Sequence, residues 1–104
     1  MARVTERRVG RAVLEILAAR TSGQASIRDI KRELPTHIAL SIEDRKDSVT
    51  RLNEEMWEQQ VRNLKSHDKT QGNIFHEGFA EVVGRGVWRI TDAGRHHIAR
   101  RTAA

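Results

Sequence analysis

The chain of 104 residues carries 19 Lys and Arg against 14 Asp and Glu, a formal net charge of +5, and it has no cysteine. This length suits a single domain with a modest hydrophobic core, and the lack of cysteine excludes disulfides and thiolate metal sites. The positive charge favours a polyanionic partner, although a merely soluble basic domain fits it as well. The stretch MARVTERRVG is too polar for a signal peptide and no run is apolar enough to span a membrane, so we expect a cytoplasmic protein.

The first predicted element is an amphipathic helix over about residues 5–20. Apolar side chains recur there at helical spacing, at Val9, Ala12, Val13, Ile16 and Leu17. The segment TSG at 21–23 then ends the helix.

A short second helix is predicted to begin after Ser26, which is a good N-cap with Asp29 three residues further on. We expect this helix to end at Pro35 or just before it, because the residue before a proline avoids the helical region. The preceding GQA at 23–25 is compatible with a short strand.

Residues 36–53 form a long connection, and connections of this length often carry function. Ile38, Leu40 and Ile42 alternate, which allows a few extended residues, and a short helical turn after Ser41 is an alternative. The polar stretch EDRKDSVTRLN at 43–53 predicts a loop.

The third helix is predicted over about residues 54–67. Trp57, Val61 and Leu64 fall at i, i+4 and i+7 and should face the core. The opposite side then carries hydrogen-bonding side chains with few acids, from Gln59, Arg62, Asn63 and Ser66.

A β-hairpin follows, with FAEVV at 79–83, the turn GRG at 84–86 and VWRIT at 87–91. Ala80 and Val82 should face Trp88 and Ile90 across it, with Glu81 and Arg89 pointing outward. A last helix over about 92–101 should begin after Thr91 as its N-cap.

Three helices, a hairpin and a last helix are the order of a winged helix-turn-helix, a mainly α, α+β domain over residues 1–104 with the hairpin at about 79–91 as its wing. In that arrangement the third helix enters the major groove, where Arg pairs with guanine and Gln or Asn with adenine. The predicted partner is therefore double-stranded DNA, and a homodimer would place two such helices on one duplex. The candidate DNA contacts are Gln59, Arg62, Asn63, Lys65, Ser66, Lys69, Arg85 and Arg51.

The segments EEMWEQQVRNLKSH and GFAEVVGRGVWRITDAGR resemble winged helix domains of restriction endonucleases. The resemblance is to the N-terminal domain of Mrr-type systems and to the C-terminal domain of adenine-methyl-directed endonucleases. It implies a restriction-associated or regulatory DNA-binding protein, and a reader of adenine-methylated DNA. By this resemblance Trp57 or Trp88 could contact the methyl group, and the alternative is that both indoles lie in the core.

Catalytic signatures are missing from the sequence. There is no H-E-x-x-H set, no phosphate-binding G-x-x-x-x-G-K-[ST] loop and no G-x-S-x-G elbow. Phosphodiester cleavage needs clustered carboxylates that are preorganised around a metal ion. The densest acidic group, Glu43, Asp44 and Asp47, lies in the predicted loop at 43–53, which we expect to be too mobile to preorganise such a site. We therefore expect a non-enzyme without metal, cofactor or small-molecule substrate. The alternative function is a protein-interaction or dimerisation module, with Val4 and Val9 extending an apolar edge of the first helix.

Overall fold

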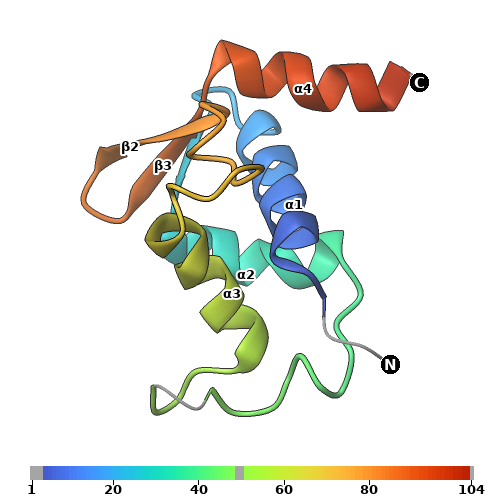
Figure 1. Cartoon of the computed structure of the whole chain (residues 1–104), viewed down its shortest axis with the longest axis vertical. Helices are drawn as coiled ribbons and strands as arrows, with labels where there is room; N and C mark the ends of the chain where they lie inside the picture. Colours follow the sequence, from blue (N-terminus) through green and yellow to red (C-terminus); the bar gives the residue numbers. More distant parts are fainter. Residues whose placement is uncertain (1–3, 49–50, 104) are drawn as a thin grey trace.

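The structure is a computed structural model that describes the backbone of residues 4–48 and 51–103 and the side chains of residues 4–48 and 51–100. Within these residues the chain forms four helices and a small antiparallel sheet, an α+β fold that is compatible with a winged helix (Figure 1). In chain order the elements are α1 (Glu6–Ala18), β1 (Gln24–Ser26), α2 (Ile27–His37), α3 (Met56–Ser66), β2 (Ala80–Gly84), β3 (Val87–Ile90) and α4 (Asp92–Ala103).

Helix α1 lies at the centre of the fold, where it contacts α2, α3 and α4. Its start is capped by Thr5, whose hydroxyl accepts a hydrogen bond from Arg8 N at 3.1 Å. The apolar stripe predicted from the sequence is fully buried, with Val9, Ala12, Val13, Ile16 and Leu17 at 0% exposure. The helix is three residues shorter than the predicted span of about 5–20, because it begins one residue later and ends at Ala18.

Helix α2 corrects one expectation, because it continues to His37 with Pro35 inside it. A proline near the end of a helix removes one intrahelical hydrogen bond. The last turn compensates for this loss, since Thr36 Oγ1 donates to the Glu33 carbonyl at 2.7 Å and Ile38 N donates to the Leu34 carbonyl at 3.2 Å. The predicted cap is confirmed, with Ser26 Oγ accepting from Asp29 N at 3.1 Å.

The sheet has the strand order β1-β3-β2, so the short strand β1 extends the predicted hairpin by a third strand. The hairpin register is the predicted one, with Ala80 opposite Ile90 and Val82 opposite Trp88. Glu81 and Arg89 lie opposite each other on the outside and form an ion pair at 2.7 Å. A bulge between Val82 and Gly84 shifts the register near the hairpin turn.

The connection between α2 and α3 contains no strand within the described residues. Ile38 has the extended backbone that the alternation at 38–42 allows, with φ −137 and ψ 146, but it pairs with no strand. Ile38 is buried while Ile42 is 83% exposed, and the backbone turns after Ser41, where Arg45 N donates to the Ser41 carbonyl at 3.3 Å. The described parts of the predicted loop are irregular, and Val49 and Thr50 lie outside the description.

Helix α4 begins as predicted after Thr91, whose Oγ1 accepts from Gly94 N at 3.0 Å and donates to the Gly78 carbonyl at 2.6 Å. Gly94 lies so close to β2 that a Cβ added to it would meet the Phe79 carbonyl oxygen at 2.2 Å. The spacing I-T-x-x-G thus combines a cap with a close backbone approach.

Candidate nucleic-acid interface

Helix α3 has the orientation that its sequence predicts. Trp57, Val61 and Leu64 are buried at 7%, 0% and 1% exposure. The Trp57 indole donates from Nε1 to Glu55 Oε1 at 2.7 Å, which satisfies its polar atom at the edge of the core. The side turned away from the core carries half-buried Gln59, Arg62 and Asn63 and exposed Lys65 and Ser66.

Two residues of this polar side contact the loop that precedes α3. Arg62 binds the Glu54 carboxylate through Nε at 3.2 Å and through Nη2 at 3.1 Å. Ser48 Oγ donates to Gln59 Oε1 at 2.6 Å. The sequence predicted that these side chains point into solvent, and the structure instead gives both a partner within the chain.

The Glu54–Arg62 pair is only partly accessible to water, with side-chain exposures of 7% and 25%. The hydrogen bond from the Arg62 guanidinium, opposed by desolvation, lowers the pKa of the Glu54 carboxyl below its usual value. A buried carboxylate needs a cation or hydrogen-bond donors around it. Arg62 therefore stabilises the Glu54 carboxylate in the loop before α3, in addition to facing outward.

Backbone hydrogen bonds tie this loop to the first turn of α3. Met56 N donates to the Lys46 carbonyl at 2.7 Å, and Trp57 N donates to the Asp44 carbonyl at 2.9 Å. Asp44 itself is 2% exposed and accepts from Val4 N at 2.8 Å and from Ser41 N at 2.9 Å. The acidic loop is therefore part of the packed fold, and its Asp44 is a structural acceptor.

Helix α2 adds a basic face that the sequence reading did not include among the candidate contacts. A shallow hollow between α2 and α3 is lined by Arg28, Lys31 and Arg32 on one side and by Glu55 and Glu58 on the other. The three cations stand at i, i+3 and i+4, a helical spacing that could have been read from the sequence. Arg32 pairs with Asp29 at 3.0 Å, whereas Arg28 is exposed and makes no hydrogen bond or ion pair with the described residues.

The turn between β2 and β3 presents an exposed Arg85, between Gly84 and Gly86. Gly86 has φ +67, a left-handed conformation that favours glycine. Beside the turn, Val82 and Val83 are 46% and 37% exposed, so this end of the hairpin combines one cation with an apolar surface.

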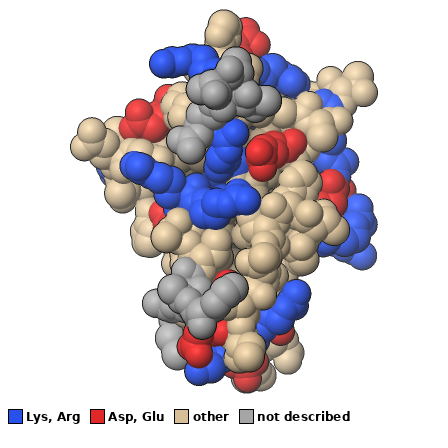
Figure 2. All heavy atoms as spheres, turned by 90° about the vertical axis from the view of Figure 1, so that its right-hand side faces the viewer, with Lys and Arg blue, Asp and Glu red and all other residues tan. Residues whose placement is uncertain are grey.

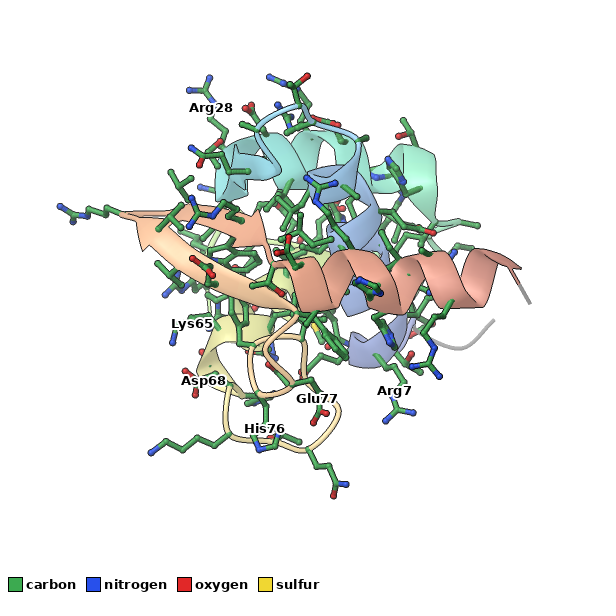
Figure 3. The ribbon with its side chains drawn as sticks, turned by 90° about the horizontal axis from the view of Figure 1, so that it is seen from above. Arg7, Arg28, Lys65, Asp68, His76 and Glu77 are labelled. Carbon is green, nitrogen blue, oxygen red and sulfur yellow. The ribbon has the colours of Figure 1, made fainter. Side chains whose placement is uncertain are left out.

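The other predicted contacts lie at the surface but are not brought to one point. Lys65 pairs with Asp68 at 2.5 Å and its Nζ lies 6.0 Å from the centre of the Phe75 ring. Lys69 and Arg51 are exposed, on the segments after and before α3. Seen from above, Arg28 and Lys65 both lie on the half of the molecule toward which the hairpin projects, and Arg7 lies on the other half (Figure 3).

The model of one protein family, described as the Mrr N-terminal domain, matches residues 8–100. The chain belongs to the Mrr N-terminal domain family. The match extends from α1 into α4, so it includes every strand and helix around α3. This membership confirms the predicted likeness to Mrr-type domains and gives the chain a restriction-associated context. Neither the comparison with curated proteins nor that with solved structures yielded a match.

In this Mrr N-terminal domain both tryptophans lie in the core. Trp57 is 7% and Trp88 2% exposed, and Phe75 packs edge-to-face on Trp88 with ring centres 4.9 Å apart. In this conformation the two indoles support α3 and the hairpin from beneath and offer almost no ring surface to a base.

Within the described part of this Mrr N-terminal domain, no helix is both long and apolar enough to cross a bilayer. Across residues 4–48 and 51–100, no three His, Asp or Glu side chains stand close enough to hold a metal ion together.

Proposed function

We propose that this Mrr N-terminal domain is a winged helix that binds double-stranded DNA, with α3 in the major groove and the β2–β3 hairpin as the wing. The observation that carries the proposal is the orientation of α3. Its apolar side is buried in the core, and its polar side lies at the surface beside the basic face of α2. A major groove about 12 Å wide admits such a helix. In helix-turn-helix proteins the helix before the recognition helix, here α2, crosses the DNA backbone.

Within this proposal Arg62 reads a base and Glu54 orients it. A guanidinium has five donors in a rigid fork, and Glu54 accepts from its Nε and Nη2. Holding the fork in one orientation lowers the entropy that is lost when it meets a guanine edge. Arg28, Lys65 and Arg85 are proposed as phosphate contacts, because their charges are exposed and phosphate contacts carry no sequence information.

Sequence or adenine-methyl recognition is assigned to the amide side chains of α3. Gln59 and Asn63 are half-buried on its polar side, and an amide pairs bidentately with adenine N6 and N7. A methyl group on N6 removes one of the hydrogens that such a pair uses, so methylation would change the affinity of the site. We propose a binding protein and not a catalyst, because DNA contact needs the surface just described and no reacting group.

The alternative of an interaction module through α1 has less support from the described residues. Val9 is 0% exposed and Val4 is half-buried against the core, so these two side chains do not form an apolar edge for a second copy. The exposed large apolar side chains are instead Ile42, Leu52, Val82 and Val83.

The decisive experiment selects preferred duplexes from a random library, unmodified and adenine-methylated, and measures affinity at two salt concentrations. Arg62→Ala should weaken binding to the preferred duplex about tenfold or more relative to random DNA. Arg28→Ala should weaken both equally and make the salt slope shallower by about one. Arg7→Ala, on the other half of the molecule, is the matched control and should change neither when the duplexes carry 5′-hydroxyl ends (Figure 3).

Two outcomes would oppose the proposal. Equal losses on preferred and random DNA for Arg62→Ala would reduce this residue to a phosphate contact. A wild-type chain that shows no salt-dependent duplex binding but captures a protein partner would favour the interaction module.

A further inference from the structure

A second basic site lies away from α3, in a groove bounded by α1, by the segment 71–79 and by α4. Its volume is about 520 Å³, and its lining includes Arg7, Arg8, Arg11, Glu77, Phe79 and His97. Figure 2 faces the right-hand side of Figure 1, toward which α4 extends, and shows Lys and Arg side chains gathered in the upper half of that face.

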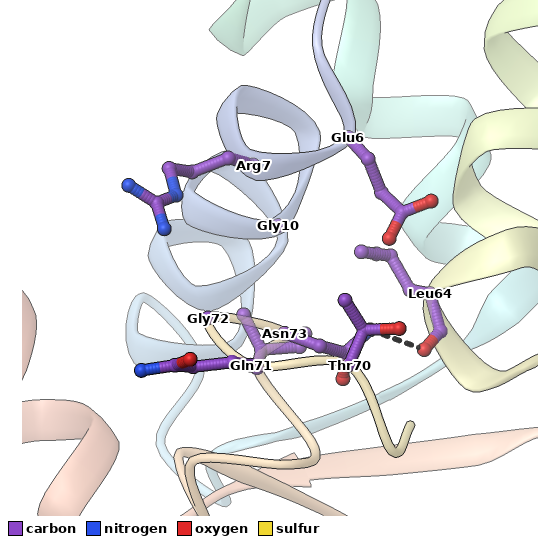
Figure 4. A pocket seen from close by; sticks show the side chains of 9 residues that line it. Glu6, Arg7, Gly10, Leu64, Thr70, Gln71, Gly72 and Asn73 are labelled. Atoms are coloured by element: carbon purple, nitrogen blue, oxygen red, sulfur yellow. Dashed lines mark hydrogen bonds between the residues drawn. The ribbon is translucent and has the colours of Figure 1, made fainter. Parts of the chain in front are cut away.

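The cations of this groove come from one stripe of α1. Arg7 and Arg11 are four residues apart and Arg8 lies between them, so all three point to neighbouring positions on the helix surface. Arg7 extends from α1 toward the side of α4, while Glu6 points to the opposite side of the helix (Figure 4). Glu6 therefore does not neutralise the groove, and it is bound to His67 at 2.7 Å instead.

The charges that line the groove do not balance. Three guanidinium groups face one carboxylate of the lining, that of Glu77. Glu15 pairs with Arg11 at 3.7 Å, so one positive charge remains in excess. The Glu77 carboxylate already accepts from Gly72 N at 3.1 Å and contacts His76 Nδ1 at 2.9 Å. The hydrogen bond with His76 is the main cause that lowers the pKa of Glu77, and the charge of Arg7 contributes to it.

Donor groups of these arginines lack partners within the described part of the chain. Arg7 makes no hydrogen bond or ion pair there, and Arg8 makes one long contact, from Nη2 to the His37 carbonyl at 3.4 Å. Arg11 Nη1 is buried without a hydrogen-bond partner, and its Nε lies 3.7 Å from Glu15. Arg7 and Arg8 are exposed, so an anion in the groove would reach donor groups of theirs that the described residues leave without partners.

The rest of the lining includes a stacked ring pair and two apolar side chains. The Phe79 ring stacks on the His97 imidazole, with centres 4.3 Å apart and planes 14° from parallel. Leu14 and Ile74, at 1% and 5% exposure, lie beneath the arginine side chains. A ligand of this groove should thus combine an anionic group with a planar ring.

We propose that the groove binds a nucleoside 5′-phosphate, either as a free nucleotide or at the end of a DNA strand. The phosphate accepts hydrogen bonds from Arg7, Arg8 and Arg11, and the base lies on the Phe79–His97 pair. A phosphate monoester is an anion with three strong acceptor oxygens, so it can accept from all three guanidinium groups. A carboxylate or an internal phosphodiester has two such oxygens.

Size and position agree with this ligand. Pockets for small ligands have volumes of about 300–1,000 Å³, and this groove falls within that range. Arg7 lies on the other half of the molecule from Arg28 (Figure 3), so the groove is separate from the surface proposed to contact duplex DNA. The inference therefore does not depend on the proposed function.

Isothermal titration calorimetry without any duplex tests the inference. The four deoxynucleoside 5′-monophosphates should each bind more tightly than deoxyadenosine or inorganic phosphate. Arg7→Gln and Arg8→Gln should each weaken this binding about tenfold or more, because each removes a charge-assisted hydrogen bond. His97→Ala should weaken it about fivefold or more through lost stacking, and Arg28→Gln is the matched control that should leave it unchanged.

A second arm identifies the source of the nucleotide. A single strand with a 5′-phosphate that binds more tightly than the same strand with a 5′-hydroxyl, and than the free monophosphates, assigns the groove to strand ends. Equal binding of the two strands with retained monophosphate binding assigns it to free nucleotides. The inference is overturned if no monophosphate and no phosphorylated strand binds the wild-type chain at millimolar concentration, or if binding persists unchanged in Arg7→Gln and Arg8→Gln.

Discussion

Replacing Gly94 by alanine is a test in which two physical effects predict opposite signs. Gly94 lies in the first turn of α4, and alanine has a higher helix propensity than glycine by about 1 kcal/mol. Propensity alone therefore predicts a more stable protein. The packing of α4 on Phe79, just before β2, and on Ile90 of β3 predicts the reverse, because the added Cβ would meet the Phe79 carbonyl oxygen at 2.2 Å and Ile90 Cγ1 at 2.8 Å.

The structure indicates that packing wins. A Cβ normally stays at least 3.0 Å from its neighbours, so this contact requires a shift of about 0.8 Å, and overpacking of this kind costs about 1–3 kcal/mol. The obstacle is a backbone carbonyl that also accepts from Thr91 N at 3.0 Å. Weakening that hydrogen bond adds about 0.5–1.5 kcal/mol. After subtraction of the propensity gain, we expect Gly94→Ala to lower the free energy of unfolding by about 2 kcal/mol, the middle of a range of about 0.5–3.5 kcal/mol.

Urea denaturation followed by circular dichroism measures this loss, and thermal unfolding should show a melting temperature lower by about 8–16 °C. Gly10→Ala in α1 is the matched control, because its Cβ would meet side-chain carbons, Ile74 Cγ2 at 3.0 Å and Leu64 Cδ2 at 3.5 Å. Side chains can yield where a carbonyl cannot, so this variant should stay within about 1 kcal/mol of wild type. A Gly94→Ala chain as stable as wild type would refute the reasoning about the close approach.

Two further predictions concern the loop before α3. Arg62 lowers the pKa of Glu54 in the folded state, so the stabilisation from this pair is complete above the unfolded pKa of about 4.5 and is lost as the pH falls through the folded value. On acidification the melting temperature of wild type should therefore fall more steeply than that of Glu54→Gln, and parallel curves would argue against the pair. Asp44→Ala should lower the free energy of unfolding by about 2–4 kcal/mol, since Val4 N and Ser41 N lose their acceptor, whereas exposed Asp47→Ala should change it by less than about 0.5 kcal/mol in the same urea titration.

Side-chain periodicity made several parts of the fold predictable. The inward face of α3 follows from the spacing of Trp57, Val61 and Leu64, because a helix with one apolar stripe is stable when that stripe is buried. The hairpin register follows from the alternation on β2 and β3, since a shift by one residue would turn Trp88 away from the core. Both features follow from the spacing of side chains within one helix or one hairpin, so they can be read from that segment alone.

Pro35 shows the limit of a local rule. The residue before a proline tends to leave the helical region, yet α2 continues because Leu34 is fully buried and the following turn finds other hydrogen bonds. Burial of a large side chain outweighs a modest backbone preference, and the sequence alone gives no measure of that burial.

The sequence by itself determined which side of each helix is apolar, where α4 is capped and which residue types α3 can present. Only the tertiary structure decided that Arg62 is held by Glu54, that Gln59 meets Ser48, and that arginines of α1 share a groove with His97 of α4. The physical reason is that periodicity records the environment of a residue relative to its own helix. The path of an irregular loop and the meeting of distant elements depend on packing, which no single segment encodes.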